Sequence, residues 1–377
     1  MKRIAKFTWL HNGNYGSTLQ ALALQRFLRD NEFDIIDIDY DASLKTKLLN
    51  WIKCKNSPKL FLGKFEEAKG RKAYSHPERF VERARRFDEF KKKNMKLSKL
   101  YRSPQELKVA VSDYDIFICG SDQIWSPALM NPVYYLDSVP NDKVKIAYAP
   151  SFGVIRTTEA KKRKIAGYLR SFKYLSVRET QGQELVKELI KREVPVQVDP
   201  TMLISKSQWA EYAGIPLKNE KYIFCYLLTP NPVYIKAVKK ISKERGLPVI
   251  IIPTSKGPFE TGFEEHVDAG PSEWLNYIQN ADLICTDSFH GCIFSSIFER
   301  EFLLFKRFKD SDKKSENSRV YTLTKLLGVE DRLIDANNID SLKELNPIDF
   351  EYLKNTIGFE AEKSGEWLLN ILKTECK

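Results

Sequence analysis

A histidine in a polar turn is the side chain of this sequence best suited to proton transfer. His290 lies in the run DLICTDSFHG, residues 282–291, where an apolar stretch leads into polar residues. The run predicts a strand, a turn and then a helix that begins near His290. Ligands of open α/β sheets bind beyond the carboxyl ends of the strands, and an imidazole exchanges protons near neutral pH. Position alone allows two interpretations: a catalytic histidine, or a turn in which Asp287 and Ser288 cap the helix.

Polar loops follow other predicted strands in the same way. Residues 13–17 (GNYGS) open a helix, and N–H groups at such an end can bind an anion. The loop is neither a Walker A motif nor a GxGxxG fingerprint, and a tight turn explains it equally well. Residues 120–123 (GSDQ) and 151–153 (SFG) could hold a hydroxyl-rich ligand. Arg178 follows another apolar stretch and suits bidentate contact with phosphate or carboxylate, with Glu179 as the structural alternative.

Strands alternate with helices along most of the chain, which predicts an α/β fold with parallel sheets covered by helices on both faces. Strands are predicted at residues 4–10, 34–40, 114–119, 144–149, 174–177, 196–198, 222–228, 248–252, 283–285 and 301–305. Helices are predicted at 18–28, 178–191, 233–245 and 271–280, and after His290. Residues 205–221 lack a long apolar run and mark a domain boundary. We expect domains at 1–205 and 206–346, followed by a helical tail at 347–377 that packs back across them.

Composition narrows the class of protein. The chain has 377 residues, 42% of them hydrophobic, and no apolar run of the roughly 18 residues that a membrane span needs. Its N-terminus lacks the apolar segment of a signal peptide, so we expect a cytoplasmic protein. The six cysteines are scattered, without a CxxC pair, and predict neither a disulfide framework nor a metal site.

The net charge of +11 is concentrated in one segment. Residues 64–108 contain 15 Lys and Arg against 7 Asp and Glu, within a mostly helical insertion at about 41–108. Arg79, Arg83 and Arg86 recur at helical spacing between phenylalanines, which predicts a basic amphipathic helix. An anionic membrane, a phosphorylated substrate or nucleic acid could bind it, and a solvated charged face is the plain alternative. No nucleic-acid-binding motif accompanies the charge, so nucleic acid is not expected.

Five motifs together resemble those of the polysaccharide pyruvyl transferases. They are HNGNYGSTLQA (11–21), CGSDQIW (119–125), SVRE (176–179), VDPT (198–201) and TDSFHG (286–291), and they cover roughly residues 1–330 apart from the insertion. The resemblance implies a GT-B-like fold, with two Rossmann-like domains and a cleft between them. It also implies transfer of a pyruvyl group from phosphoenolpyruvate to a sugar as a ketal. We expect no cofactor besides phosphoenolpyruvate as co-substrate. The N-terminal domain would be the acceptor side and the C-terminal domain the phosphoenolpyruvate side.

The resemblance carries over to particular residues. It implies that His290 is catalytic and that Arg178 contacts phosphoenolpyruvate, whose methylene carbon must gain a proton from a general acid. Asp287 or Asp122 could accept the proton of the attacking hydroxyl. The remaining predicted substrate-binding residues lie in the same loops and in the NSRV run: Ser288, Gly291, Arg319, Asn317, Asn14, Tyr15, Gly16, Ser121, Asp122, Gln123 and Ser151.

Two other classes of protein remain open at this point. A GT-B glycosyltransferase that uses a nucleotide sugar would share the architecture. A non-catalytic module could instead dock its basic helix on a partner or membrane. If the acceptor is a lipid-linked precursor of a cell-surface polysaccharide, the basic residues at 79–93 could hold the enzyme peripherally on the inner membrane face.

Overall fold

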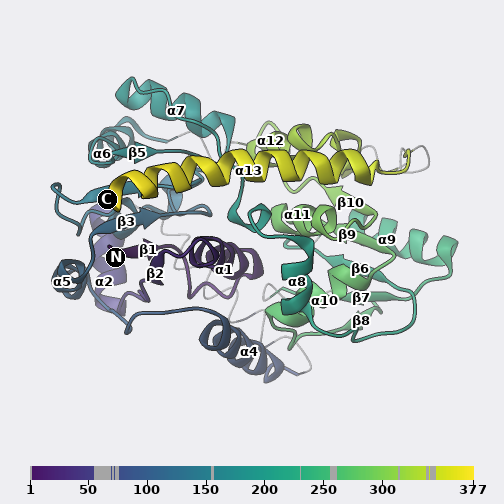
Figure 1. Cartoon of the computed structure of the whole chain (residues 1–377). Helices are drawn as coiled ribbons and strands as arrows, with labels where there is room; N and C mark the ends of the chain where they lie inside the picture. The colour runs from purple at the N-terminus through teal and green to yellow at the C-terminus, as the bar shows by residue number, and fades with distance from the viewer. Residues whose placement is uncertain are drawn as a thin grey trace.

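Two separate parallel sheets form the framework of the chain, as the computed structural model shows (Figure 1). The structure describes residues 2–54, 69, 72, 76–153, 157–229, 231–254, 261–312, 315–336, 339 and 345–377. Residues 55–68, 70–71 and 73–75 of the predicted insertion therefore lie outside the described residues.

The first sheet has the order β2-β1-β3-β4-β5, with every neighbouring pair parallel. Its strands are β1 (Arg3–Phe7), β2 (Asp34–Asp37), β3 (Ile116–Cys119), β4 (Val144–Ala147) and β5 (Tyr174–Leu175). The second sheet has the order β11-β10-β9-β6-β7-β8 and is also parallel. Its strands are β6 (Ile223–Tyr226), β7 (Val249–Ile251), β8 (Glu264–Glu265), β9 (Leu283–Thr286), β10 (Phe302–Phe305) and β11 (Leu333–Ile334). Strands β3, β6 and β10 consist of buried apolar and aromatic residues, because both faces of each sheet are covered.

The helices described in the N-terminal half of the chain belong to the first domain and its insertion. They are α1 (Tyr15–Asp30), α2 (Leu44–Cys54), α4 (Arg79–Asn94), α5 (Pro104–Ala110), α6 (Glu159–Leu169) and α7 (Thr180–Ile190). The later helices are α8 (Lys206–Ala213), α9 (Pro232–Arg245), α10 (Pro271–Asn280), α11 (Phe289–Ile297), α12 (Asn317–Leu327) and α13 (Phe350–Glu375). The predicted α/β class with two Rossmann-like domains is thereby confirmed.

One predicted strand is not formed in the structure. The strand predicted at 196–198 is only an isolated bridge between Val177 and Val196. Pro195 and Pro200 lie on either side of this segment. Because a proline has no N–H group to donate to a neighbouring strand, the pairing cannot extend beyond them. Residues 205–221, the predicted domain boundary, include the helix α8, whose start is fixed by a capping box at Ser205, and the boundary itself stays a prediction.

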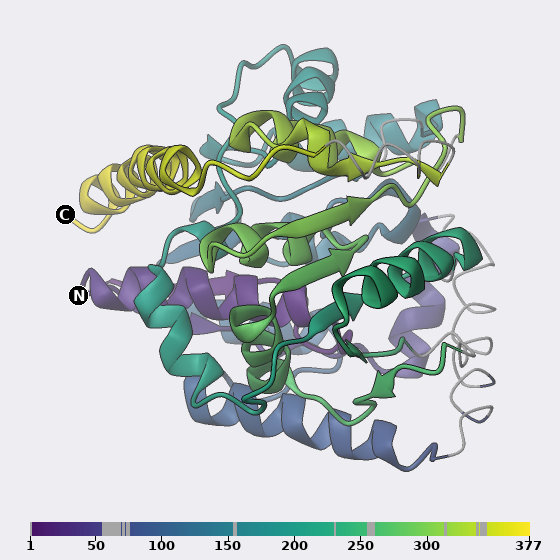
Figure 2. The ribbon, with the colours of Figure 1, turned by 90° about the vertical axis from the view of Figure 1, so that its right-hand side faces the viewer.

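Two helices join the domains on opposite sides of the molecule (Figures 1 and 2). The helix α13 runs across both: Leu353 belongs to the core shared with the second sheet, and Leu368 packs with strands of the first. Near its middle, Ser364 accepts a hydrogen bond from Val198 N at 3.2 Å. On the other side, α4 comes from the first domain and contacts the second. The predicted tail at 347–377 thus contains a long helix that packs across both domains.

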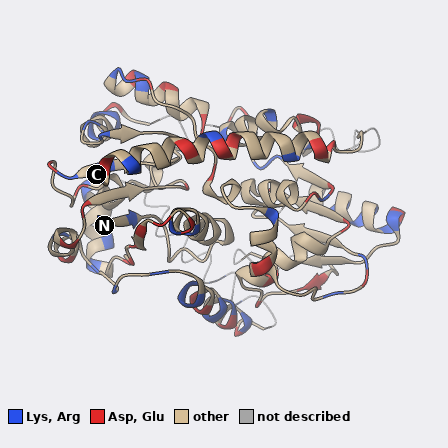
Figure 3. Ribbon diagram, in the orientation of Figure 1, with Lys and Arg blue, Asp and Glu red and all other residues tan. Residues whose placement is uncertain are grey.

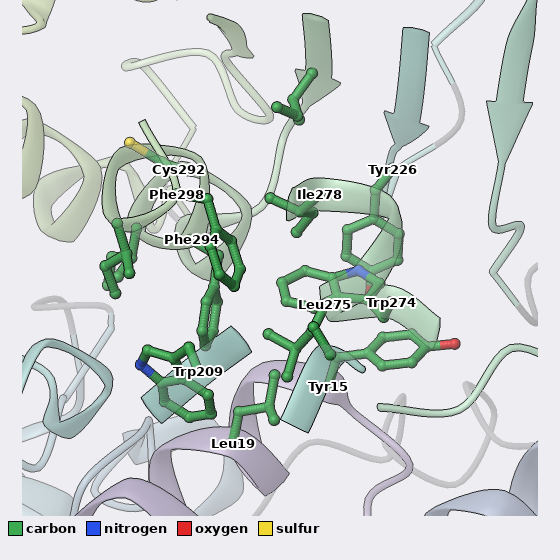
Figure 4. Packing of buried hydrophobic residues seen from close by; sticks show 14 of the residues in the cluster. Tyr15, Leu19, Trp209, Tyr226, Trp274, Leu275, Ile278, Cys292, Phe294 and Phe298 are labelled. Carbon is green, nitrogen blue, oxygen red and sulfur yellow. The ribbon is translucent and has the colours of Figure 1, made fainter. Parts of the chain in front are cut away.

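An aromatic core lies between the two domains (Figure 4). Tyr15 of α1 stacks on Trp274 of α10, with ring centroids 5.4 Å apart and planes 10° from parallel. Trp209 of α8 contacts Phe294 of α11 edge to face at 4.7 Å. Aromatic rings bury a large apolar area when they pack. This core therefore holds the two domains against each other.

Candidate active site

A cavity of about 750 Å³ opens between the domains at the carboxyl ends of both sheets. The loop after β1, the loop after β3 and the helix α4 contribute one wall. The opposite wall comes from the start of α11 and from residues that follow β10. Its polar lining residues include His11, Asn12, Asn14, Tyr15, Ser17, Arg83, Lys91, Asp122, Gln123, Ser288, His290, Arg307, Glu316 and Arg319.

His290 is held where the N-termini of two helices meet. Ser288 caps α11 by accepting a hydrogen bond from Gly291 N at 3.2 Å, which places His290 in the first turn. The imidazole lies against Gly16 in the first turn of α1. A Cβ atom at position 16 would lie 2.0 Å from Nδ1 of His290, so only glycine fits there. The Asn14 side chain caps α1 in turn.

Asp199 connects this histidine to Arg178. Its Oδ2 atom lies 2.6 Å from Arg178 Nη1 and 3.3 Å from His290 Nε2. Burial favours the neutral acid, but the charges of His290 and Arg178 outweigh it and hold the pKa of Asp199 well below its usual range. Asp199 and Arg178 belong to the first domain and His290 to the second. The three side chains therefore form a junction across the cleft.

Two arginines flank the ring of Phe289 beside this junction. The Cζ atom of Arg178 lies 4.6 Å from the ring centroid, and that of Arg319 lies 5.6 Å from it. Burial, together with the nearby charge of Arg178, lowers the pKa of Arg319 despite its 2.9 Å ion pair with Glu316. In the described part of the chain, the Nε atoms of both arginines have no hydrogen-bond partner. Buried donors without acceptors are suited to an anionic ligand.

Asp122 lies on the other side of Arg178. Its Oδ1 atom is 3.8 Å from Arg178 Nη2 and accepts a hydrogen bond from Gln123 N at 2.8 Å. The hydroxyl of Ser17 donates to its second oxygen. Asp122 thus positions the arginine while it faces the cavity, together with Gln123.

Asp287 and Asn317 are tied to neighbouring backbone. The carboxylate of Asp287 accepts hydrogen bonds from Leu228 N at 2.6 Å and Thr229 N at 2.9 Å, which fixes the loop after β6. Asn317 donates to Phe308 O at 2.8 Å at the start of α12. These contacts position loops around the cavity, and a role of Asp287 in proton transfer stays a prediction.

Three further predicted residues are buried in the scaffold of the cleft. Ser121 donates to Ala149 O at 2.7 Å, and the Ser151 hydroxyl lies 3.1 Å from Glu179. Tyr15 donates to Ala269 O at 2.6 Å, and burial raises its pKa to about 12. The Glu179 carboxylate also accepts from Phe152 N at 2.8 Å, so it shapes the loop after β4 and does not pair with Arg178.

Sequence reasoning did not select several residues that the structure brings to the site. Asp199 directly follows the predicted strand 196–198, and an acidic residue at the end of a strand is the signal that could have identified it. Ser17, Phe289 and Glu316 give no comparable signal, because their roles depend on contacts between distant segments. His11 pairs with Asp39 at the cavity, so two of the four histidines of the chain border it.

The basic helix α4 directs three arginines toward the second domain. Arg83 donates to Val267 O at 2.5 Å and to Pro253 O at 3.0 Å, and Arg79 pairs with Asp268. Arg86 lies 3.0 Å from both Asp268 and Glu273. Figure 3 shows that acidic and basic residues alternate along this helix. The basic residues at 79–93 were predicted to contact a membrane, but much of their charge is paired within the molecule. Membrane contact through the exposed side of the helix stays a prediction.

The described residues contain no group of three or more His, Cys, Asp or Glu side chains arranged to hold a metal ion. None of the helices among them combines the length and the hydropathy required to cross a bilayer.

Comparisons with known proteins agree with this architecture. A family model described as polysaccharide pyruvyl transferase matches residues 14–307. The fold is similar to that of UDP-GlcNAc 2-epimerase from Methanocaldococcus jannaschii in complex with UDP-GlcNAc and UDP, at 13% identity, 99% coverage of both chains and a TM-score of 0.52. It is also similar to UDP-GlcNAc 2-epimerase from Neisseria meningitidis bound to UDP-GlcNAc, at 11% identity, 98% and 100% coverage and a TM-score of 0.51.

An alpha-glucosyltransferase in complex with UDP and a 13-mer DNA is similar at 11% identity, 97% and 95% coverage and a TM-score of 0.50. At these identities the similarities show the GT-B-type fold alone. No curated protein matches the sequence.

Proposed function

The protein belongs to the polysaccharide pyruvyl transferase family, because the match covers more than half of the chain, and we propose that it transfers a pyruvyl group from phosphoenolpyruvate to a sugar. The acceptor is a unit of a cell-surface polysaccharide or its lipid-linked precursor. The product is a cyclic ketal, formed when two hydroxyls of the acceptor bond to C2 of the donor.

The observation that carries this proposal is the junction of His290, which lines the cavity, with the buried Asp199 and Arg178. The Asp199 carboxylate, 3.3 Å from Nε2, attracts a positively charged imidazole and orients it. His290 then donates a proton to the methylene carbon of phosphoenolpyruvate, which makes C2 electrophilic. A positioned general acid of this kind contributes about 10²–10⁴-fold to the rate.

The arginines supply the complementary charge for the donor. Arg178 and Arg319 each have an unpartnered buried Nε beside Phe289, which suits the carboxylate and phosphate of phosphoenolpyruvate. Arg178 comes from the first domain and Arg319 from the second, so the donor would be bound by both. Their charge also stabilises the phosphate as the C2–O bond breaks.

The remaining steps conserve atoms and protons. One sugar hydroxyl attacks C2 and releases its proton to a base, for which Asp122 faces the cavity and Asp287 lies close to it. Inorganic phosphate leaves, and a second hydroxyl closes the ketal with loss of its own proton. One phosphoenolpyruvate and one diol thus give one ketal and one phosphate.

A nucleotide-sugar glycosyltransferase is the alternative that the experiment must separate. We would measure thermal unfolding with phosphoenolpyruvate and, in parallel, with UDP. Phosphoenolpyruvate at 100 times its dissociation constant should stabilise the protein by about 2.7 kcal/mol. The shift should vanish in Arg319→Gln and persist in Lys325→Gln, a control at an exposed position on the same helix α12. Stabilisation by UDP alone would contradict the proposal.

A further inference from the structure

The helix α2 presents an apolar stripe to solvent. Leu44, Leu48, Leu49 and Ile52 are 84%, 48%, 56% and 60% exposed. Leu44, Leu48 and Ile52 recur every four residues and Leu49 lies next to Leu48, which places the four on one side of the helix, while Thr46 and Cys54 on the other side are buried. Isolated exposed leucines are ordinary on a protein surface, but a contiguous apolar patch marks an interaction site.

Basic residues border this stripe. Lys45 and Lys53 are exposed on α2, and the helix contains no acidic residue. The helix α6 lies next to its C-terminal end, because Lys164 Nζ donates to Lys53 O at 2.5 Å. Arg163 and Lys164 of α6 are exposed as well. Exposed cations of α2 therefore border the apolar side chains, and those of α6 lie close to the C-terminal end of the stripe.

We propose that this surface, made of Leu44, Leu48, Leu49 and Ile52 with Lys45 and Lys53, docks on an anionic lipid bilayer. A short helix with apolar side chains between lysines is suited to the boundary between headgroups and acyl chains. The lysine stems reach outward to lipid phosphates while the leucines enter the apolar layer. A second copy of this chain is a poor occupant, since its net charge of +11 would repel the same cations.

The docking surface differs from the basic helix that the sequence indicated. Arg79, Arg83 and Arg86 of α4 contact the second domain, and α4 presents no comparable stripe of exposed leucine and isoleucine. Membrane contact through α2 leaves those interdomain contacts intact. It also does not depend on the proposed reaction, because none of these residues borders the cavity.

Vesicle co-sedimentation of the full chain tests this inference. Wild type should bind vesicles containing phosphatidylglycerol and should bind pure phosphatidylcholine vesicles much more weakly. The double variant Leu48→Ser/Ile52→Ser should lower the partition coefficient at least roughly tenfold, since two apolar side chains lose their lipid contact. Lys45→Glu/Lys53→Glu should also abolish the preference for the anionic lipid.

The control is the pair Val109→Ser/Ile215→Ser, which removes apolar residues of similar exposure (77% and 85%) at other places on the surface. Vesicle binding should not change in this pair, and an equal loss would overturn the inference. Thermal unfolding of Leu48→Ser/Ile52→Ser should remain as in wild type. A large loss of stability in this variant would show that the stripe is covered by this chain itself. Equal binding of the wild type to both kinds of vesicle would contradict a docking surface for anionic lipid.

Discussion

Gly16 determines where the imidazole of His290 can lie. An added methyl group would fall 2.0 Å from Nδ1, so Gly16→Ala must displace the ring or the start of α1. We expect kcat to fall roughly 100-fold, the loss typical of a misplacement of about 1 Å. The control is Gly167→Ala in α6, where the methyl group meets no atom within 4 Å and the rate should not change. Normal turnover of Gly16→Ala would contradict the assigned position of His290.

Asp199 contributes to the free energy of unfolding, and its contribution depends on pH. Its pKa in the folded chain is depressed, so its contribution is complete above the unfolded value of 3.8 and is lost as the pH falls below it. At neutral pH, Asp199→Asn leaves Arg178 buried without its closest carboxylate, which should cost roughly 3 kcal/mol. Denaturant unfolding from pH 7 to pH 2 should show a smaller decline for this variant than for wild type. Parallel curves would contradict the proposed ion pair.

At the scale of elements, ion pairs from arginines of α4 connect the insertion to the second domain. Arg86→Ala removes two 3.0 Å contacts, to Asp268 and Glu273, and should destabilise the protein by roughly 1–2 kcal/mol at low salt. The effect should shrink in high salt, because the side chains are partly exposed. Arg85→Ala is the matched control, since among the described residues Arg85 pairs with Glu82 and Glu89 of its own helix. Equal melting shifts for both variants would argue against an interdomain role.

Most elements could be predicted from the sequence because their apolar pattern is local. The helix predicted at 271–280 coincides with α10, and strands such as β9 and β10 lie within a residue or two of their predicted bounds. His290 and Arg178 could be placed at strand ends for the same reason. Asp199, which joins them, could not be identified, because His290 meets Asp199 and Arg178 only when the two domains pack. Likewise, the partners of Asp287 lie in a loop about 60 residues away.

At the scale of the whole molecule, the two domains share one core and should unfold together. A single buried cluster includes Leu19 of α1 with Trp209, Trp274 and Phe294 of the second domain. The helix α13 adds contacts to both. We therefore expect one calorimetric transition in which the van't Hoff and calorimetric enthalpies agree. Two resolved transitions would show that the domains are independent and that the cleft is not held by this core.

The site likewise belongs to neither domain alone. The first domain supplies Arg178 and Asp199, the second supplies His290 and Arg319, and the cavity between them is bordered by both. A donor bound there would contact both domains, so its binding should further stabilise the packing of one domain against the other.

Phosphate release from phosphoenolpyruvate tests the proposed chemistry most directly. Wild type and His290→Gln would be incubated with phosphoenolpyruvate and an envelope glycan fraction, and followed by ³¹P NMR for phosphate and by ¹H NMR for the methyl group of the ketal. We expect both signals to grow together in wild type and about 10²–10⁴-fold more slowly in the variant, which lacks the general acid. Turnover by His290→Gln at the wild-type rate, or phosphate release without a ketal methyl signal, would contradict the account.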